Sequence, residues 1–401
     1  RKTARPAFTI VEICSILLFI GVLVGLLLPA VQASREMARR TSCANNLTQV
    51  GLATHHYHSA FKQLPTQLSG TDGNIIVGKD NDRRLSCFVG LLPFLEMSGL
   101  SENIGQPLDW RGPASAREMW YFNDEFQAAG EESGHQPDKG PWVAGGPEPF
   151  QSKYLPWLTE PSVLRCPSDP GIGSPSFGRT NYAICLGDGV VAADSGPMKE
   201  IKGVFVHDPE LAKQTKASMR GVFVPRVAMR FSDTTDGFSN TLMLGEIATD
   251  LGDQDIRTSP AAGPGAQVLR DNPAWAHQGE LIDPERPMFW ESGRPSKVLG
   301  GDNSMRRGFR WADGMPLYTA FNTILPPNRE ITLRDDRDDC WGVLPASSRH
   351  QGGAHVCFLD GAVRFISDSI DAGDDSLPTV YDGSVNPPGS QSPYGLWGAL
   401  G

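Results

Sequence analysis

The sequence lacks several features that would assign it to common functional classes. Its 401 residues include 36 Lys and Arg against 46 Asp and Glu, a net charge of -10. A chain without a basic excess is not expected to be a general nucleic-acid binder. It has no Cys-X-X-Cys pair, a common signature of zinc and thiol redox sites. It also has no internal repeat and no evident linker, which favours one large domain over a string of modules.

Turn-forming residues are abundant, with 44 Gly and 32 Pro, and the 39% hydrophobic content is sufficient for a core. Beyond Pro65, short apolar runs alternate with Gly, Pro, Asn and Asp, a pattern that predicts an antiparallel β domain with long loops. Residues 85–95 are expected to form a short helix or a strand pair. We expect loop-rich insertions at about 103–150 and 250–303.

A long apolar run lies near the N-terminus. No residue from Ile13 to Leu28 is charged, and with its flanks the run is long enough to cross a hydrocarbon core of about 30 Å. Arg1, Lys2 and Arg5 precede it and favour a cytoplasmic N-terminus, although basic residues on its far side reduce this bias. The sequence therefore predicts a single membrane-spanning segment.

Glu12 lies inside this run, and an ionisable residue in a spanning segment is costly and usually functional. A cleaved secretory signal peptide is the alternative interpretation. Its apolar region would be about 7–15 residues long and would end at small residues. The observed run is longer and begins with a carboxylate, so we favour a retained helix.

The helical pattern continues past Pro29 to about Phe61, which predicts one helix of about 75 Å. Its apolar positions recur at intervals of three, four and seven: Met37, Ala44, Leu47, Val50, Thr54, Tyr57 and Phe61. His55, His56 and His58 are not expected to bind a metal, because metal-binding pairs on a helix are spaced i and i+4.

The segment Ala7-Phe8-Thr9-Ile10-Val11-Glu12 with the apolar helix after it resembles the class III signal of type IV prepilins and pseudopilins. The resemblance implies cleavage between Ala7 and Phe8 by a prepilin peptidase, followed by N-methylation of Phe8. It gives Glu12 a partner in the positive N-terminus of Phe8 of a neighbouring subunit. Pro29 lies where pilin helices often kink. The chain departs from the usual pattern in having Ala7 in place of Gly.

Several further segments resemble, in order along the chain, a bacterial family that is abundant in planctomycetes. This family is DUF1559, also called bacterial solute-binding protein family 10. The segments are Cys43-Ala44-Asn45-Asn46-Leu47, His56-Tyr57-His58, Cys166-Pro167-Ser168-Asp169, Asn181-Tyr182, Asp236-Gly237-Phe238-Ser239-Asn240-Thr241, Gly245-Glu246, Tyr318-Thr319-Ala320-Phe321-Asn322-Thr323, Pro326-Pro327-Asn328 and Ser348-Arg349-His350. His350 and Asp360-Gly361 form the H-X9-DG pattern associated with prepilin-type processing.

Asp360-Gly361 joins two β-prone runs, 355–359 and 362–366, and predicts a hairpin with a type I′ turn. His350 is expected to anchor the loop before this hairpin by hydrogen bonds rather than to act in catalysis. By the same reasoning Asp236-Gly237 predicts a turn before a strand at Thr241–Leu244. Asp313-Gly314 is a third predicted turn.

Two site hypotheses compete with this structural interpretation. His350, Asp360 and Glu246 could gather around a metal or act as acid and base, but no motif fixes their geometry. The stretch Arg334–Asp339 could hold calcium, although it lacks an EF-hand pattern and a solvated charged loop is the favoured interpretation. We therefore expect no catalytic residue, no metal and no cofactor.

Six of the seven cysteines would lie outside the cytoplasm, where disulfides persist. Cys14 lies in the apolar run and is expected to be a packing residue. Fifteen pairings of the other six are possible. Pairs Cys166–Cys185 and Cys340–Cys357 are favoured because each closes a modest loop, and they leave Cys43 to pair with Cys87.

The resemblances imply an α+β, pilin-like fold in which a long N-terminal helix, transmembrane in its first half, packs on an antiparallel β-sheet head with large loop insertions. The expected regions are a leader (1–7), a transmembrane helix (8–30), its continuation (31–62) and an exported head (63–401). The implied location is the inner membrane, with a cytoplasmic N-terminus, an extracytoplasmic head and a surface filament as a further state.

The implied role is that of a structural subunit rather than an enzyme. Its partners would be other pilin-like subunits, prepilin peptidase, the membrane, and type IV pilus or type II secretion machinery, with no nucleic acid. The alternative is a membrane-tethered solute-binding or receptor protein whose helix stays in the bilayer.

Overall fold

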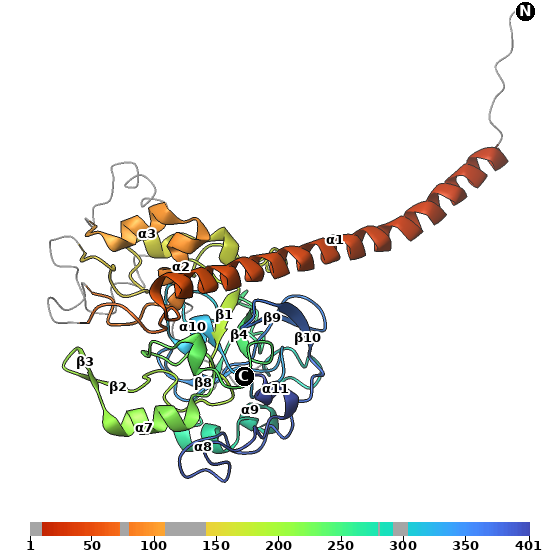
Figure 1. The fold of residues 1–401 in the computed structure, drawn as a ribbon. Helices are drawn as coiled ribbons and strands as arrows, with labels where there is room; N and C mark the ends of the chain where they lie inside the picture. Colours follow the sequence, from red (N-terminus) through yellow and green to blue (C-terminus); the bar gives the residue numbers. More distant parts are fainter. Residues whose placement is uncertain (1–9, 73–79, 109–141, 280, 292–303) are drawn as a thin grey trace, which may run out of the picture.

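A long helix projects from a head in the computed structural model, which describes residues 10–72, 80–108, 142–279, 281–291 and 304–401 (Figure 1). Helix α1 runs from Ile10 to Phe61 without interruption, so its length is about 78 Å. This confirms the predicted helix and its end at Phe61. Ala7 and Phe8 lie outside the described residues.

The centre of the head is a five-stranded sheet with the order β10-β9-β4-β1-β6. Its hydrogen-bonded neighbours are antiparallel except for the parallel pair β1 and β6. The strands are β1 (Tyr182–Cys185), β4 (Leu242–Glu246), β6 (Ala320–Phe321), β9 (Gly353–Phe358) and β10 (Val363–Ser367). A long helix beside a largely antiparallel sheet confirms the predicted α+β class.

Two smaller sheets and short helices surround this centre. Strands β2 (Met198–Ile201) and β3 (Val204–His207) form a hairpin, and β5 (Ala261–Ala262), β7 (Thr332–Leu333) and β8 (Gly342–Val343) form a three-stranded sheet. The α-helices are α2 (Cys87–Leu91), α3 (Ser98–Gly105), α6 (Leu155–Leu158), α7 (Pro209–Ser218), α8 (Ala266–Asp271), α9 (Trp275–Gln278), α10 (Pro316–Thr319) and α11 (Gly395–Ala399). The 3-10 helices are η1 (Leu92–Leu95), η3 (Ser162–Leu164) and η4 (Phe231–Asp233). Residues 85–95 were predicted to form either a short helix or a strand pair, and helices α2 and η1 confirm the helix.

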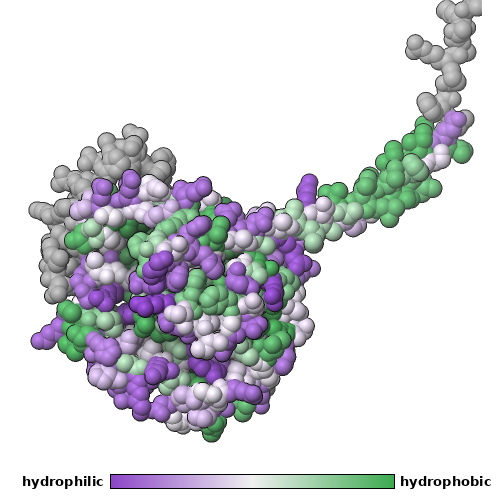
Figure 2. All heavy atoms as spheres, viewed as in Figure 1, coloured by the Kyte–Doolittle hydropathy of each residue, from purple (hydrophilic) through white to green (hydrophobic). Residues whose placement is uncertain are grey.

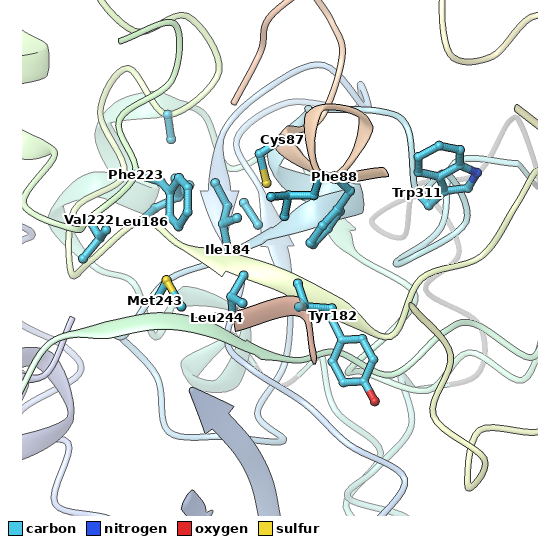
Figure 3. Close-up of a cluster of buried hydrophobic side chains, with 14 of the residues drawn as sticks. Cys87, Phe88, Tyr182, Ile184, Leu186, Val222, Phe223, Met243, Leu244 and Trp311 are labelled. Atoms are coloured by element: carbon cyan, nitrogen blue, oxygen red, sulfur yellow. The ribbon is translucent and has the colours of Figure 1, made fainter. Parts of the chain in front are cut away.

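The main hydrophobic core lies around β1 and β4, the inner strands of the central sheet (Figure 3). Both strands are buried at every position, and strands covered on both faces carry continuous apolar runs instead of alternating ones. Ile184 and Leu244 pair across the two strands, and each fully buried side chain of this kind contributes about 1.5–3 kcal/mol. The edge strand β10 is partly buried at Val363, Phe365 and Ile366 and exposed at its two other positions.

The second half of α1 lies against this sheet, and its close approach depends on Gly51. A Cβ added at Gly51 would lie 2.9 Å from the Sγ of Cys357 on β9, so a larger residue would push helix and strand apart. Leu47, Val50 and Thr54 are buried, as predicted. Met37 and Phe61, which were assigned to the same face, are 60% and 57% exposed.

The predicted hairpin is confirmed, since β9 and β10 pair from Gly353 with Ser367 to Cys357 with Val363. The predicted turn type is wrong. Gly361 has a φ of 87°, but Asp360 is not in the positive-φ region that a type I′ turn requires. The Gly361 amide donates to the Phe358 carbonyl and the Ala362 amide donates to the Asp360 carboxylate. One left-handed glycine after a tight turn is the usual geometry of a three-residue hairpin loop.

The turn at Asp236-Gly237 is also confirmed, with Gly237 at φ 90° shortly before β4 begins at Leu242. The third predicted turn is wrong. Asp313 is completely buried and binds the Arg84 side chain, and Gly314 has no positive φ. A charged contact, rather than a turn preference, places this aspartate.

The structure describes more of the second predicted insertion than of the first. Most of the first, residues 109–141, lies outside the described residues, as do residues 280 and 292–303 of the second. The described part of the second insertion is more regular than expected, because it contains β5, α8 and α9. Strand β5 and helix α9 contribute to a small separate apolar cluster: Ile256, Ala261, Ala276, Leu281 and Trp290.

Candidate functional site at the helix–head junction

The first half of α1, residues 10–31, projects away from the head as an exposed apolar rod (Figure 2). Within the described residues, α1 is the helix long and apolar enough to cross a membrane. Glu12 lies in its first turn. Pro29 lies inside the helix, which curves without a break (Figure 1). This rod is one candidate functional surface, and the junction where α1 meets the head is the other.

The first side chain of α1 to bind the head is Glu36. Its Oε1 lies 2.6 Å from Nδ1 of His350, and its Oε2 accepts hydrogen bonds from Arg39. Burial raises the pKa of Glu36, but the hydrogen bonds from His350 and Arg39 outweigh it and leave that pKa below its usual value. The predicted role of His350 as a hydrogen-bonding anchor thus extends to the long helix itself.

Two turns further along, a disulfide joins Cys43 of α1 to Cys166 of the head, with 5.1 Å between the Cα atoms and 123 residues between them in sequence. This bond excludes the favoured pair Cys166–Cys185 and the remaining pair Cys43–Cys87, and the favoured pair Cys340–Cys357 is wrong because both of its cysteines are free. Loop length suggested them, but the fold brings Cys166 to the helix instead. This bond ties α1 covalently to the head.

The four cysteines of the head that do not take part in this disulfide are separate buried thiols. Cys185 and Cys340 lie in different apolar clusters, and Cys87 and Cys357 lie in the main core. Burial raises the pKa of Cys185 to about 12, of Cys340 to about 11 and of Cys357 to about 12, and it raises that of Cys87 further. Thiols in such surroundings are packing residues and are chemically inert.

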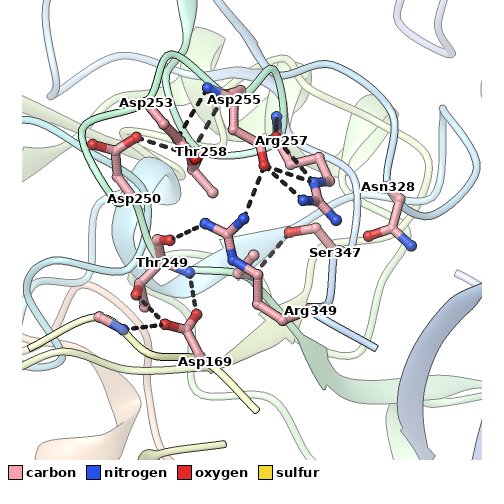
Figure 4. A network of polar contacts seen from close by, with 12 residues as sticks. Asp169, Thr249, Asp250, Asp253, Asp255, Arg257, Thr258, Asn328, Ser347 and Arg349 are labelled. Atoms are coloured by element: carbon pink, nitrogen blue, oxygen red, sulfur yellow. Dashed lines mark hydrogen bonds and ion pairs between the residues drawn. The ribbon is translucent and has the colours of Figure 1, made fainter. Parts of the chain in front are cut away.

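Two hydrogen-bonding residues hold Cys166 in place. The Oδ1 of Asn181 accepts a bond of 3.0 Å from the Cys166 amide. Asp169 accepts a bond from the side chain of Asn181. It also accepts bonds from the amide and hydroxyl of Thr249 (Figure 4). These contacts explain the segments Cys166-Pro167-Ser168-Asp169 and Asn181-Tyr182 as a clamp that fixes the loop carrying Cys166.

Glu246 ends strand β4 directly beside this disulfide and is only 1% exposed. Its Oε2 accepts a bond of 2.9 Å from the His355 amide, and its Oε1 lies 3.0 Å from Nδ1 of His355. Nε2 of His350 is 3.8 Å from the same Oε1. Tyr182, the partner of Glu246 in β1, donates its hydroxyl to the Cys43 carbonyl at 3.0 Å.

The loop before β9 presents His350 to this group. Its amide donates to the hydroxyl of Ser348, whose own amide donates to the side chain of Asn328. Arg349 donates to Asp255 at 2.9 Å and to the Thr249 carbonyl at 2.8 Å (Figure 4). A dense polar network thus fixes the loop, and with it the position of the His350 ring.

Four buried groups consequently meet at the junction. Their potential ligand atoms lie within 4.8 Å of one another, in the residues Cys43, Cys166, Glu246 and His350. Of the site hypothesised from His350, Asp360 and Glu246, the fold brings His350 and Glu246 together, and the hypothesis is wrong for Asp360. Asp360 is exposed in the hairpin turn at the opposite end of β9. Neither the role of Glu36 nor the pairing of Cys43 with Cys166 could be predicted, because no spacing rule links such distant segments.

The segment considered for calcium, Arg334–Asp339, is a set of ion pairs. Asp335 pairs with Arg334 and Asp339 with Arg337. Asp338 turns inward, where its Oδ2 accepts bonds from Arg84, Arg310 and Tyr318 at 3.0, 2.9 and 2.6 Å. Arginines therefore neutralise the carboxylates of Asp335, Asp338 and Asp339. The predicted solvated loop is wrong for Asp338, which is buried.

The histidines of α1 pack rather than gather. His55 and His58 contact the ring of Phe231, with centroid distances of 4.9 and 4.1 Å. His56 is exposed.

Comparison with known proteins gives one match, and it is to a family. The sequence profile described as SBP_bac_10, protein of unknown function (DUF1559), matches residues 32–373. No curated protein and no solved structure matches the chain significantly. The matched region begins just after the apolar half of α1 and includes Glu36, both cysteines of the disulfide, Glu246 and His350. The chain therefore belongs to the DUF1559 family.

Proposed function

We propose that this protein is a type IV pilin- or pseudopilin-like structural subunit. The apolar half of α1 would store it in the inner membrane, with its N-terminus in the cytoplasm and its head outside. Processing between Ala7 and Phe8 by a prepilin peptidase would then release a subunit that assembles with others into a filament or a secretion pseudopilus. The head would present its loops for interaction at the surface.

The observation that carries this proposal is the apolar rod with a carboxylate near its start. Residues 10–31 are exposed along their whole length and span about 33 Å, close to the thickness of a hydrocarbon core. A plain anchor of that length gains nothing from a charged residue such as Glu12, whereas a subunit that docks on the N-terminus of its neighbour does. The rigid attachment of α1 to the head also suits a subunit that moves as one body.

The membrane-tethered receptor remains the alternative, and Glu12 distinguishes the two. In a receptor, Glu12→Gln would change neither location nor binding. In a filament subunit, Glu12→Gln should leave membrane insertion intact and reduce assembly at least tenfold, because the counter-charge for the neighbouring N-terminus is lost. Assembly would be measured by shearing the cell surface and by crosslinking in isolated membranes.

Ser15→Ala is the matched control, since it also replaces a polar side chain in the same segment. It should insert and assemble like the parent protein. Mass spectrometry of the mature N-terminus adds an independent test. A chain that begins with methylated Phe8 supports the proposal, whereas an uncut leader, or normal assembly of the Glu12→Gln variant, contradicts it.

A further inference from the structure

We propose that the reduced form of this protein binds one zinc ion at the helix–head junction, through Cys43, Cys166, Glu246 and His350. This site goes beyond the proposed structural role and does not depend on it. Two sulfurs, an imidazole nitrogen and a carboxylate oxygen suit tetrahedral zinc better than calcium or magnesium, which prefer oxygen ligands. All four residues are buried, and their ligand atoms already lie within 4.8 Å of one another.

The distances match the shape of a zinc site. Tetrahedral zinc with bonds of about 2.0–2.3 Å holds its ligand atoms about 3.3–3.8 Å apart. Nε2 of His350 lies 3.5 Å from Sγ of Cys166 and 3.8 Å from Oε1 of Glu246. The edge between nitrogen and sulfur therefore has the required length, and the edge between nitrogen and oxygen must shorten by a few tenths of an ångström. The separation that must increase is that between the two sulfurs, and reduction of the disulfide permits it.

The neighbours of His350 and Glu246 orient both as ligands. Nδ1 of His350 contacts the Glu36 carboxylate at 2.6 Å, so the proton belongs on Nδ1 and the lone pair of Nε2 points toward the sulfurs. Histidine ligands of zinc are typically held by a carboxylate in this way. His355 holds Glu246 through its amide and its ring.

The chemical step balances with a dithiol as reductant. The dithiol gives two electrons and two protons to the disulfide, which becomes two thiols while the dithiol becomes a disulfide. When zinc binds, the two thiols release two protons to solvent and both thiolates donate to the metal. With Glu246 counted as a carboxylate, the oxidised group and the zinc group both carry a formal charge of minus one. The buried site therefore gains no net charge.

The full-length protein in detergent tests this inference with cobalt and zinc as probes. After reduction with a dithiol and its removal without air, alkylation and mass spectrometry would verify that both thiols are free. We expect one cobalt ion per chain, with the visible bands of tetrahedral cobalt and a thiolate charge-transfer band. Zinc should displace the cobalt. The oxidised protein should bind neither ion at this site.

Variants assign the ligands. His350→Ala, Glu246→Gln and the double change Cys43→Ser with Cys166→Ser should each abolish the cobalt spectrum. Glu36→Gln, which removes only the support of His350, should weaken binding by about 10- to 100-fold. This milder change tests the site even if a ligand variant fails to fold, which circular dichroism would reveal. Cys340→Ser and His277→Ala, at a buried thiol elsewhere and an exposed histidine, should bind like the parent.

Three results would overturn the proposal. One is a reduced protein that retains no metal, and another is bound cobalt without thiolate bands. The third is an affinity that stays the same in His350→Ala, Glu246→Gln and Glu36→Gln. None of these results involves filament assembly, so a failure here is distinct from a failure of the structural role.

Discussion

At the scale of single residues, Asp338 shows how one carboxylate can organise a buried region. It accepts bonds from two arginines and a tyrosine, and the same arginines contact Asp313. Burial raises the pKa of Asp338, but Arg84 and Arg310 outweigh it and hold that pKa well below its usual value. The two arginines and two aspartates together carry no net charge.

Asp338→Asn should destabilise the head by about 3–5 kcal/mol, because it leaves arginine charge buried without its partner. The pH dependence follows from the lowered pKa. The ionised carboxylate stabilises the folded state above its unfolded pKa near 3.8, and this contribution is lost as the pH falls toward the lower folded pKa. Urea unfolding between about pH 6 and pH 3 should therefore show a shallower loss of stability in the variant.

Asp339→Asn is the matched control for this prediction. Asp339 pairs with Arg337, whose side chain is 67% exposed, and exposed pairs contribute about 0–1 kcal/mol. Equal destabilisation by the two substitutions would contradict the importance assigned to the buried network.

Residues of this kind set the limit of prediction from the sequence. Asp338 and Asp339 are adjacent and chemically identical, and only the fold turns one inward. His350 could be singled out from its motif, but its partner Glu36 lies more than 300 residues away and belongs to another element. The same holds for Cys43 and Cys166, whose pairing depends on a loop that Asn181 and Asp169 hold in place.

At the scale of elements, α1 carries a continuous stripe of contacts to the head. Its members recur at intervals of four and three residues: Glu36, Arg40, Cys43, Leu47, Val50 and Thr54. Glu36 binds His350, Arg40 lies 3.8 Å above the ring of Phe365, and Cys43 forms the disulfide. The stripe is polar and covalent near the apolar rod and apolar further along.

Hydrophobic periodicity could predict only the apolar end of this stripe. Leu47, Val50 and Thr54 have the spacing of an amphipathic helix, and the structure buries them. Arg40, which packs on Phe365 at the polar end, is charged, and hydrophobic periodicity does not mark such a residue as a contact. The two β-prone runs on either side of Asp360-Gly361 made the β9–β10 hairpin predictable, whereas the order of the sheet depends on long-range pairing that no local pattern encodes.

Gly51→Ala should destabilise the protein by about 1–3 kcal/mol, the usual cost of overpacking. A Cβ there would lie 2.9 Å from the Sγ of Cys357, and this clash should exceed the gain of about 1 kcal/mol from better helix propensity. Chemical unfolding of the full-length protein in detergent would measure the change.

Gly99→Ala in α3 is the control, because a Cβ at Gly99 meets nothing within 4 Å. It should be neutral or slightly stabilising. Adding Cys357→Ala to Gly51→Ala should recover part of the loss, as a double-mutant cycle would detect. Additive effects in that cycle would argue against a direct clash.

At the scale of the whole molecule, a rod and a head share one helix, and the two parts can be separated at a defined point. No buried residue of α1 precedes Cys43, and contact with the head begins at Glu36. The family match begins at residue 32. Rod and head therefore divide between Val31 and Glu36.

A variant that begins at Gln32 should be soluble without detergent, keep the Cys43–Cys166 disulfide and unfold in one cooperative transition. Size-exclusion chromatography, thiol mapping and thermal unfolding would test this. A variant that begins at Ala44 lacks both Glu36 and Cys43, and it should be clearly less stable. Aggregation of the longer variant would contradict the separation of rod and head.

The position of the disulfide also determines how a pulling force would pass through the molecule. Tension applied along α1 from the membrane side first meets the contact of Glu36 with His350, and then the covalent bond of Cys43. Beyond that bond the helix runs alongside β9 in the same direction, from His350 toward Gly361, so the remaining contacts are loaded in shear. A machine that extracts the rod from a bilayer would thus drag the head as one body, and the sheet would not be peeled strand by strand.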